Sequence, residues 1–197
     1  MSIKIDDLCK NYGEQTIFHH YNACFADNSV TCIMGPSGCG KTTLVRILAG
    51  LEKKDAGTIE GIEGTLQAVV FQEDRLCEHL SVKMNLRLVC ATNVTDEELE
   101  TQLQAVGLVG TLDKRVSHLS GGMKRRVAIV RALIAEHDIL IMDEPFKGLD
   151  EELKQLVITH VRKKSKGKIV LIVLHDTQEV TALCPDQVLH LENLKKR

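Results

Sequence analysis

A glycine-rich segment that ends in lysine and threonine is the first candidate for chemistry in this sequence. Residues 35–42 read GPSGCGKT, which matches the phosphate-loop pattern G-x-x-x-x-G-K-[ST]. Glycines let successive backbone N–H groups point at one anion, and a following helix adds the positive end of its dipole. We expect Lys41 to bind the β- and γ-phosphates of a nucleotide and Thr42 to hold magnesium through its hydroxyl. The expected nucleotide-binding residues of this segment are Gly35, Pro36, Ser37, Gly38, Cys39, Gly40, Lys41, Thr42 and Thr43.

Two adjacent carboxylates form a second candidate. Asp143 and Glu144 follow the apolar run 139–142, so they would lie at the tip of a buried strand. Magnesium prefers hard oxygen ligands, and hydrolysis needs a group that orients water. We therefore expect Asp143 to bind magnesium and Glu144 to polarise the attacking water. An acidic pair that merely caps a helix is the alternative.

A third segment offers a second place for an anion. Ser120 precedes Gly121 and Gly122 at the start of an expected helix over 124–134. Ser120 would cap this helix, while the glycines leave its first N–H groups free. One nucleotide cannot easily contact both helix starts, so we expect two copies to pack head to tail, each completing its partner's site. A plain helix cap is the alternative.

The elements that must position these residues alternate between strands and helices. This order is typical of an α/β protein with a mostly parallel sheet that is covered on both faces. Ligands bind such sheets beyond the carboxyl ends of the strands. Asp176 and Glu179 fit a capping box at the start of the last helix. The expected strands are 30–34, 139–142 and 169–174, and the expected helices that follow the first two are 41–49 and 151–164.

The stretch over about 73–120 differs from the rest because it contains no β-rich run. Within it, Thr95 and Glu98 form a capping-box pattern ahead of apolar residues at helical spacing. We expect this stretch to be a helical insert within a single domain that covers residues 1–197.

Length and composition exclude several classes of protein. The chain has 197 residues, with 25 Lys and Arg against 27 Asp and Glu, and 3% of its residues are aromatic. This balance argues against nucleic acid as a partner. Its apolar runs fall far short of the roughly 18 residues that span a bilayer. The 7 cysteines show no metal-binding pair or disulfide framework, so we expect a reducing compartment.

Taken together, the motifs resemble those of the ATP-binding subunits of ABC transporters across essentially the whole chain. The motifs that carry the resemblance are Tyr12, GPSGCGKTT at 35–43, Gln72 in VVFQE, LSGGM at 119–123, ILIMDEP at 139–145, the turn of Gly148, Leu149 and Asp150, and His175. The resemblance implies the ABC ATPase fold, which is a P-loop NTPase core with a mostly parallel sheet, a small N-terminal antiparallel β region and a helical insert.

Further site residues are implied by this resemblance. Tyr12 would stack on adenine, and Gln72 would contact magnesium and the attacking water. Asp150 would act across the dimer interface. His175 would hydrogen-bond the γ-phosphate and help to fix the geometry with Glu144. Judged by its residue type alone, His175 would more often be a structural histidine.

The resemblance also implies a function. The chain would be an ATPase that uses ATP and magnesium, either as a homodimer or paired with a second ABC subunit. It would energise transport through a separate transmembrane permease, at the cytoplasmic face of the cell membrane, in a system that could include a solute-binding protein. Met123 and Phe146 resemble the subgroup that imports nitrate, sulfonates and taurine, so we expect import. Segment 75–88 is the expected docking surface, with ordinary local core as an equal alternative.

Two other classes of function stay open. A small-molecule kinase with a phosphate loop needs the same Lys41 and magnesium carboxylate, but it leaves Ser120 and His175 without a role. A non-transport ABC-type ATPase that acts on DNA or the ribosome would resemble relatives with long coiled-coil inserts or tandem cassettes. The sequence contains neither feature.

Overall fold

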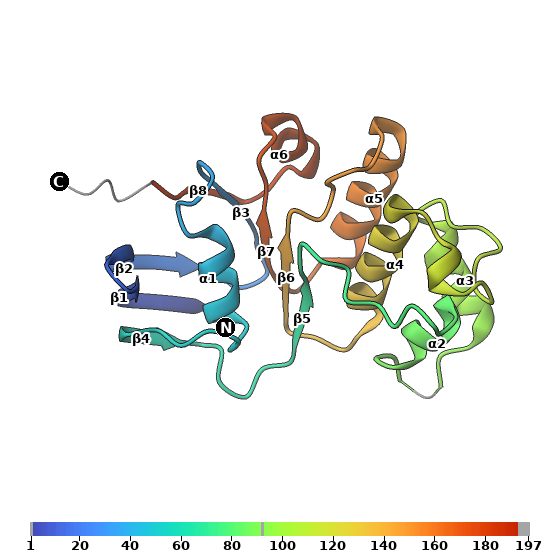
Figure 1. Cartoon of the computed structure of the whole chain (residues 1–197), viewed down its shortest axis with the longest axis horizontal. Coiled ribbons are helices and arrows are strands. Elements are labelled where there is room, and N and C mark those ends of the chain that lie inside the picture. Colours follow the sequence, from blue (N-terminus) through green and yellow to red (C-terminus); the bar gives the residue numbers. More distant parts are fainter. Residues whose placement is uncertain (1, 92, 193–197) are drawn as a thin grey trace.

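A parallel sheet lies at the centre of the computed structural model, which describes residues 2–91 and 93–192 (Figure 1). Its strand order is β5-β6-β7-β3-β8, and every neighbouring pair is parallel. The carboxyl ends of its strands therefore share one edge, where the loops after β3, β5, β6 and β7 meet. The strands are β3 (Val30–Met34), β5 (Gln67–Val70), β6 (Ile139–Asp143), β7 (Ile169–Val173) and β8 (Gln187–His190).

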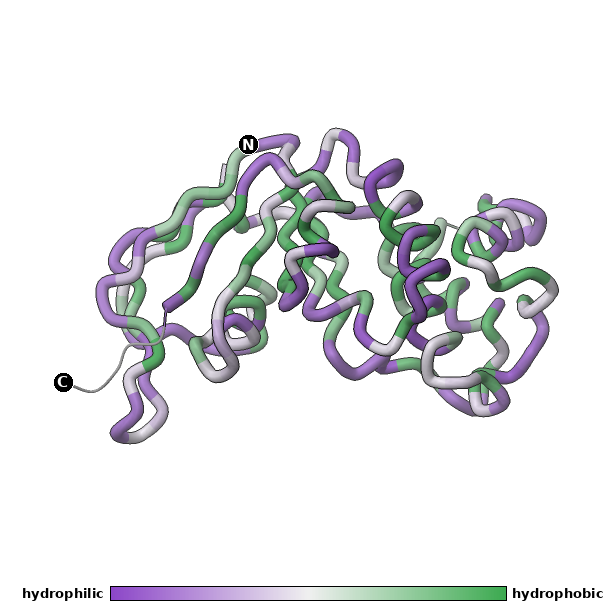
Figure 2. Tube along the Cα trace, turned by 90° about the horizontal axis from the view of Figure 1, so that it is seen from above, coloured by the Kyte–Doolittle hydropathy of each residue, from purple (hydrophilic) through white to green (hydrophobic). Residues whose placement is uncertain are grey.

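Both faces of this sheet are buried against separate hydrophobic cores. In β6, Ile139 and Ile141 pack into one core, while Leu140 and Met142 pack into the other. Alternation follows from the two-residue period of a strand, and two buried faces explain why β6 and β7 are apolar in nearly every position. Figure 2 shows hydrophobic segments along the strands in the middle of the molecule and hydrophilic segments on outer turns and helices.

The smaller sheet is antiparallel, with the order β2-β1-β4, and lies with α1 on one side of the parallel sheet (Figure 1). It supplies the antiparallel β region that the resemblance implied. A Cβ at Gly40, where α1 begins, would lie 2.6 Å from Cγ2 of Ile17 in β2. The β1–β2 hairpin therefore packs directly under the start of α1. The elements are β1 (Ile3–Tyr12), β2 (Gln15–Phe25), β4 (Ala56–Glu60) and α1 (Lys41–Leu48).

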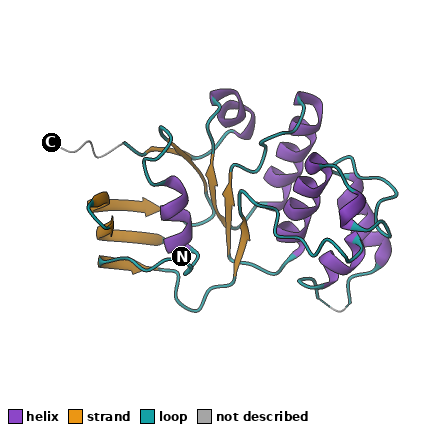
Figure 3. Ribbon diagram, viewed as in Figure 1, coloured by secondary structure: helices purple, strands orange, loops and turns teal. Residues whose placement is uncertain are grey.

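Helices cover the other side of the parallel sheet (Figure 3). Helices α4 and α5 lie next to the sheet, α2 and α3 pack beyond α4, and α6 follows β7. Among the described residues, no helix combines the length and the apolar composition that a bilayer span requires. The helical elements are α2 (Val82–Arg87), α3 (Asp96–Gln104), the 3-10 helix η1 (Val116–His118), α4 (Gly121–Ile134), α5 (Glu151–Lys164) and α6 (Thr177–Leu183).

The helix caps agree with the sequence at some positions and differ at one. Thr95 and Glu98 form the expected capping box at α3. The capping box predicted at α6 is wrong. Asp176 does cap α6, since its Oδ1 accepts from the backbone N–H of Gln178 at 2.8 Å. Glu179 instead forms an ion pair with Lys154 of α5, with 3.1 Å between Oε1 and Nζ, because this pairing gives its charge a partner.

Candidate nucleotide-binding and hydrolysis site

The phosphate loop connects β3 to α1 through glycines whose backbone angles favour glycine. Gly35, Gly38 and Gly40 have φ values of 152°, 79° and 102°. A Cβ at Gly35 would lie 2.3 Å from the carbonyl oxygen of Leu191, so no larger residue fits there. Gly40 is the N-cap of α1 and has no side chain that could occupy the helix start. The N–H groups of the first turn are therefore open to an anion.

Lys41 is folded back over the loop that precedes it. Its Nζ donates to the carbonyl oxygens of Gly35 at 2.7 Å and Pro36 at 2.9 Å, and the residue is 6% exposed. A bound phosphate would compete with these carbonyls for the ammonium group. Cys39 is also buried, with its side chain in the hydrophobic core, so only its backbone is available to a nucleotide.

One cavity joins this loop to residues that follow three neighbouring strands. Gln72 follows β5, Glu144 follows β6 and His175 follows β7. Gln15 and Ile17 of β2, which the sequence did not single out, complete the lining. The sequence-predicted residues that line the cavity are Ser37, Gly38, Gly40, Lys41, Thr42, Thr43, Gln72, Glu144 and His175.

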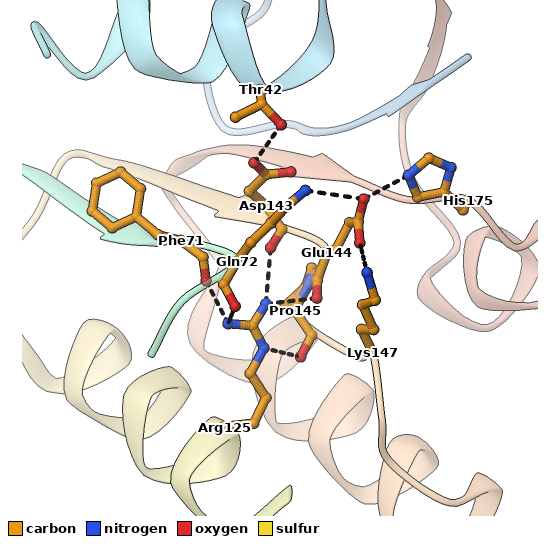
Figure 4. Close-up of polar contacts among 9 residues, drawn as sticks. All are labelled: Thr42, Phe71, Gln72, Arg125, Asp143, Glu144, Pro145, Lys147 and His175. Carbon is orange, nitrogen blue, oxygen red and sulfur yellow. Dashed lines mark hydrogen bonds and ion pairs between the residues drawn. The ribbon is translucent and has the colours of Figure 1, made fainter. Parts of the chain in front are cut away.

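Asp143 is a buried carboxylate in direct contact with the phosphate loop (Figure 4). Its Oδ2 accepts from the hydroxyl of Thr42 at 2.9 Å. Its Oδ1 is buried and has no hydrogen-bond partner within residues 2–91 and 93–192. Burial raises the pKa of Asp143, although the Thr42 hydroxyl opposes this shift. A hard cation beside Oδ1 would satisfy the orphaned oxygen, so the Thr42 and Asp143 oxygens fit magnesium.

Glu144 is held by side chains from two other segments and by one from its own loop (Figure 4). Gln72 Nε2 donates to its Oε1 at 3.1 Å, and Nε2 of His175 lies 2.6 Å from the same oxygen. Lys147 Nζ lies 3.1 Å from Oε2. Burial tends to raise the pKa of Glu144, but the Lys147 and His175 hydrogen bonds outweigh it, so the pKa lies below its ordinary value. The carboxylate is therefore ionised and can accept a proton from water.

Glu144 also has an unusual backbone conformation. Its φ is 48°, in the left-handed region that a non-glycine residue adopts at a cost of roughly 1–3 kcal/mol. Surrounding contacts must therefore hold it there. The backbone N–H of Glu144 donates to the carbonyl oxygen of Val173 at 3.1 Å, which anchors it to β7.

Arg125 of α4 hydrogen-bonds the backbone of two segments that contribute to the site, and the sequence did not single it out. It is 5% exposed, and its guanidinium group donates to backbone carbonyls at the ends of both β5 and β6 (Figure 4). The basic run 124–126, one residue beyond a glycine pair, was the available signal, but charge alone does not reveal which residues face the interior. The carbonyls belong to Phe71, Gln72, Asp143, Glu144 and Pro145.

Several predicted residues lie outside this cavity. Ser120 caps α4 by accepting from the Met123 N–H at 3.3 Å, and Asp150 caps α5 in the same way. Gly122 adjoins the turn that contains Asp150, since a Cβ there would lie 3.6 Å from the Gly148 carbonyl. The start of α4 and this turn therefore form a separate surface. Helix α4 begins at Gly121, earlier than the predicted 124, because the Ser120 cap includes both glycines.

Tyr12 is exposed near the end of β1 and also lies outside the cavity lining. Its ring packs against Lys10, with 4.7 Å between Nζ and the ring centroid. Lys10 in turn is anchored by Glu52, at 2.6 Å from Nζ to Oε1. One face of the Tyr12 ring is therefore occupied by a cation, and stacking on adenine stays a prediction.

The expected docking segment 75–88 is divided between core and surface. Val82 is fully buried, so it belongs to the local core and not to a docking surface. The exposed apolar side chains here are Met84 at 49%, Leu88 at 59% and, just beyond the segment, Val89 at 39%. The helical period explains the difference, because alternate faces of α2 meet the core and solvent.

A phosphate loop, a strand-tip carboxylate pair and an α/β sheet define a nucleotide-binding protein of the phosphate-loop class. The profile of the ABC transporter family matches residues 18–147. The chain is 36% identical over 193 residues to the aliphatic sulfonates import ATP-binding protein SsuB 2 of Pseudomonas syringae pv. tomato, covering 96% of this chain and 81% of that one. The chain belongs to the ABC transporter family.

Other relatives broaden this similarity. The sulfate/thiosulfate import ATP-binding protein CysA of Vibrio vulnificus is 32% identical over 201 residues, covering 93% of this chain and 55% of that one. Among solved structures, the dimeric bacterial ABC transporter cassette MJ0796 matches with a TM-score of 0.82 and 25% identity, over 98% of this chain and 97% of that one. The predicted ABC ATPase fold and the resemblance to ABC ATP-binding subunits are confirmed.

Proposed function

We propose that this chain is the ATP-binding and ATP-hydrolysing subunit of an importer and acts through a separate transmembrane permease. The observation that carries the proposal is the Glu144 carboxylate, which is ionised, held by Gln72 and His175, and lies in one cavity with the phosphate loop. Phosphate binding and water activation thus converge on one place.

The phosphate loop binds the triphosphate of ATP. The open N–H groups at the start of α1 receive the phosphate oxygens, and Lys41 exchanges its carbonyl partners for the β- and γ-phosphates. Thr42, Gln72 and Asp143 would hold magnesium, which would neutralise charge that develops on the phosphates. Among the described residues no cluster of His, Cys, Asp or Glu forms a metal site by itself, so phosphate oxygens would supply further ligands.

Glu144 acts as the general base. Its Oε1 is fixed by Gln72 and His175, so the carboxylate keeps one orientation toward a water next to the γ-phosphate. The water loses a proton to Glu144 as its oxygen bonds to the γ-phosphorus, and ADP leaves. His175 would hydrogen-bond the γ-phosphate oxygens as well.

Two copies of the chain complete each other's sites. Ser120, Gly121, Gly122 and Asp150 lie outside their own cavity, and the free N–H groups at the start of α4 suit a phosphate. A head-to-tail dimer, or a pair with a second ABC subunit, would bring them to the γ-phosphate bound by the partner. The similarity to a dimeric cassette supports this arrangement.

The relatives indicate the kind of transport system. Their names give import of aliphatic sulfonates and of sulfate or thiosulfate, and one relative imports spermidine and putrescine. These names support import, and we infer a permease and a solute-binding protein as partners at the cytoplasmic face of the membrane. Among the relatives, a Nod factor export protein of Paraburkholderia xenovorans is 34% identical, so direction is the part of the proposal to test on the assembled system.

Hydrolysis without an acceptor tests the proposed chemistry. The purified chain should release phosphate from ATP in the presence of magnesium alone, and Glu144→Gln should lower kcat by roughly a hundredfold or more. Glutamine is the matched replacement because it keeps the size of the side chain and removes the base. Turnover that strictly requires a small-molecule acceptor would instead identify a kinase and overturn the proposal.

A further inference from the structure

Arg125 links two segments that carry catalytic side chains. Its Nη2 donates to the carbonyl oxygens of Asp143 at 2.9 Å and Glu144 at 2.6 Å, and its Nε donates to that of Pro145 at 3.1 Å. These bonds hold the peptide groups on both sides of Glu144, the residue that has the positive φ. The guanidinium group therefore stabilises a conformation that the residue would not adopt by itself.

The opposite side of the same guanidinium group holds the segment that carries Gln72. Arg125 Nη1 donates to the carbonyl oxygens of Phe71 and Gln72, the latter at 3.3 Å, and lies 3.3 Å from Oδ1 of Asp74. A planar fork of N–H donors can serve both segments at once, whereas a lysine ammonium is a single point of charge. Gln72 and Glu144 are thus connected twice, through their side chains and through Arg125.

Helix α4 also connects Arg125 to the helix start that Ser120 caps. Its N-terminal end, capped by Ser120, lies about 7 Å along the helix axis from Arg125, at about 1.5 Å per residue. A helix of this length is a rigid connector, so the cap and the guanidinium group move together. Arg125 is consequently the place where α4 is attached to the backbone of the hydrolysis site.

We propose that Arg125 is a positioning residue that fixes Gln72 and Glu144 relative to the start of α4. The inference deepens the proposed function and rests on it, because the start of α4 would contact ATP bound by the partner subunit. Engagement of Ser120 with that ATP then sets the position of Glu144 in its own subunit. Each nucleotide thereby influences hydrolysis of the other.

A second arginine of the same helix offers a matched control. Arg131 donates to the carbonyl oxygens of Arg75 at 2.8 Å and Asp74 at 3.1 Å. It therefore holds the loop after β5 to α4, as Arg125 does, but its hydrogen bonds within the described residues do not reach Glu144. Replacing Arg131 disturbs a half-buried arginine on α4 but leaves the support of Glu144 intact.

The experiment compares Arg125→Gln, Arg125→Lys and Arg131→Gln in the full chain. Both Arg125 variants should lower kcat for ATP hydrolysis by roughly ten- to a hundredfold, because a misplaced base is costly, while KM stays within about twofold. Arg131→Gln should keep kcat within about twofold of the unsubstituted chain. Arg125→Lys keeps the buried positive charge and serves as the second variant if Arg125→Gln fails to fold.

Amide hydrogen exchange gives a readout that is independent of activity. Arg125→Lys should speed exchange in two separate stretches, 71–74 and 143–149, while Arg131→Gln should affect only the stretch near 74–78. Uniformly faster exchange across α4 and β6 would show a merely structural role and overturn the inference. Unchanged kcat and unchanged exchange in Arg125→Lys would overturn it as well.

The two proposals fail in different ways. If the unsubstituted chain hydrolyses ATP and the Arg125 variants do so equally well, only the role of Arg125 is wrong. If the unsubstituted chain does not hydrolyse ATP, the proposed function is wrong, and exchange in 143–149 still decides whether Arg125 positions that segment.

Discussion

Lys147 is a solvent-exposed contact of the candidate base. Its Nζ lies 3.1 Å from Oε2 of Glu144, and its side chain is 75% exposed. Its ammonium group favours the ionised form of Glu144 and helps to lower the pKa of that carboxyl. Lys147→Met should therefore raise the Glu144 pKa and move the acidic limb of the kcat profile to higher pH.

Lys147→Arg is the control for this prediction, because it keeps the positive charge. Its acidic limb should stay close to that of the unsubstituted chain when ATP hydrolysis is followed across pH. An acidic limb that moves equally in both variants, or in neither, would contradict the assigned role of the Lys147 charge.

At Gly40, both the positive φ and the close packing against β2 favour glycine. Gly38 has only the positive φ, so a comparison of the two positions measures the packing effect alone. A Cβ at Gly40 would collide with Ile17, whereas a Cβ at Gly38 would meet open space, and both residues have positive φ. Gly40→Ala should cost roughly 1–3 kcal/mol more than Gly38→Ala, since overpacking adds to backbone strain. Chemical denaturation of both variants measures this difference, and equal losses would show that packing against the hairpin is unimportant.

Motifs in the sequence pointed to the residues that line this site, but not to the residues that hold them in position. Thr42 and Asp143 lie far apart in the chain, yet each stands in a recognisable pattern, and the structure joins them at 2.9 Å. Arg125 has partners that are backbone carbonyls, which every residue possesses. No residue type marks such a partner, so only the folded chain reveals it.

At the scale of elements, the predictable ones are those with a continuous or strictly periodic apolar pattern. Strands β6 and β7 are buried on both faces, and α5 has apolar residues at helical spacing, so their predicted bounds agree closely with the structure. Strands β1 and β2 contain β-bulges, where Asp7 and His20 take positive φ and break the alternation. These strands were expected from the resemblance and not from their own pattern.

The start of α4 is the element whose role is most directly testable. Ser120→Arg would place a bulky cation over the free N–H groups of this helix and block a partner's γ-phosphate. It should abolish ATP hydrolysis while ATP affinity, measured by calorimetry, stays near that of the unsubstituted chain. Ser117→Arg, on the exposed face of η1, is the control and should hydrolyse ATP normally.

Equal loss of ATP binding and hydrolysis in Ser120→Arg would give a different result. It would place Ser120 in the nucleotide pocket of its own subunit, or show that the cap is needed for folding. Thermal unfolding distinguishes these outcomes, because only the second lowers the unfolding temperature strongly.

At the scale of the whole molecule, ATP should hold two copies together until it is hydrolysed. Glu144→Gln removes the base but leaves the phosphate contacts, so it should elute as a dimer in gel filtration with ATP and magnesium. With ADP it should elute as a monomer, because the γ-phosphate contact is missing. A Glu144→Gln chain that stays monomeric at saturating ATP would contradict closure around the γ-phosphate.

The position of Ser120 outside the cavity of its own subunit has a genetic consequence. If each complete site takes Glu144 from one copy and Ser120 from the other, an allele with Glu144→Gln and an allele with Ser120→Arg are each inactive alone. Expressed together, they form mixed pairs in which both defects fall in one site and the second site is intact. The two alleles would therefore complement each other within a single gene. A single allele that carries both substitutions would instead inactivate both sites of any pair that it joins.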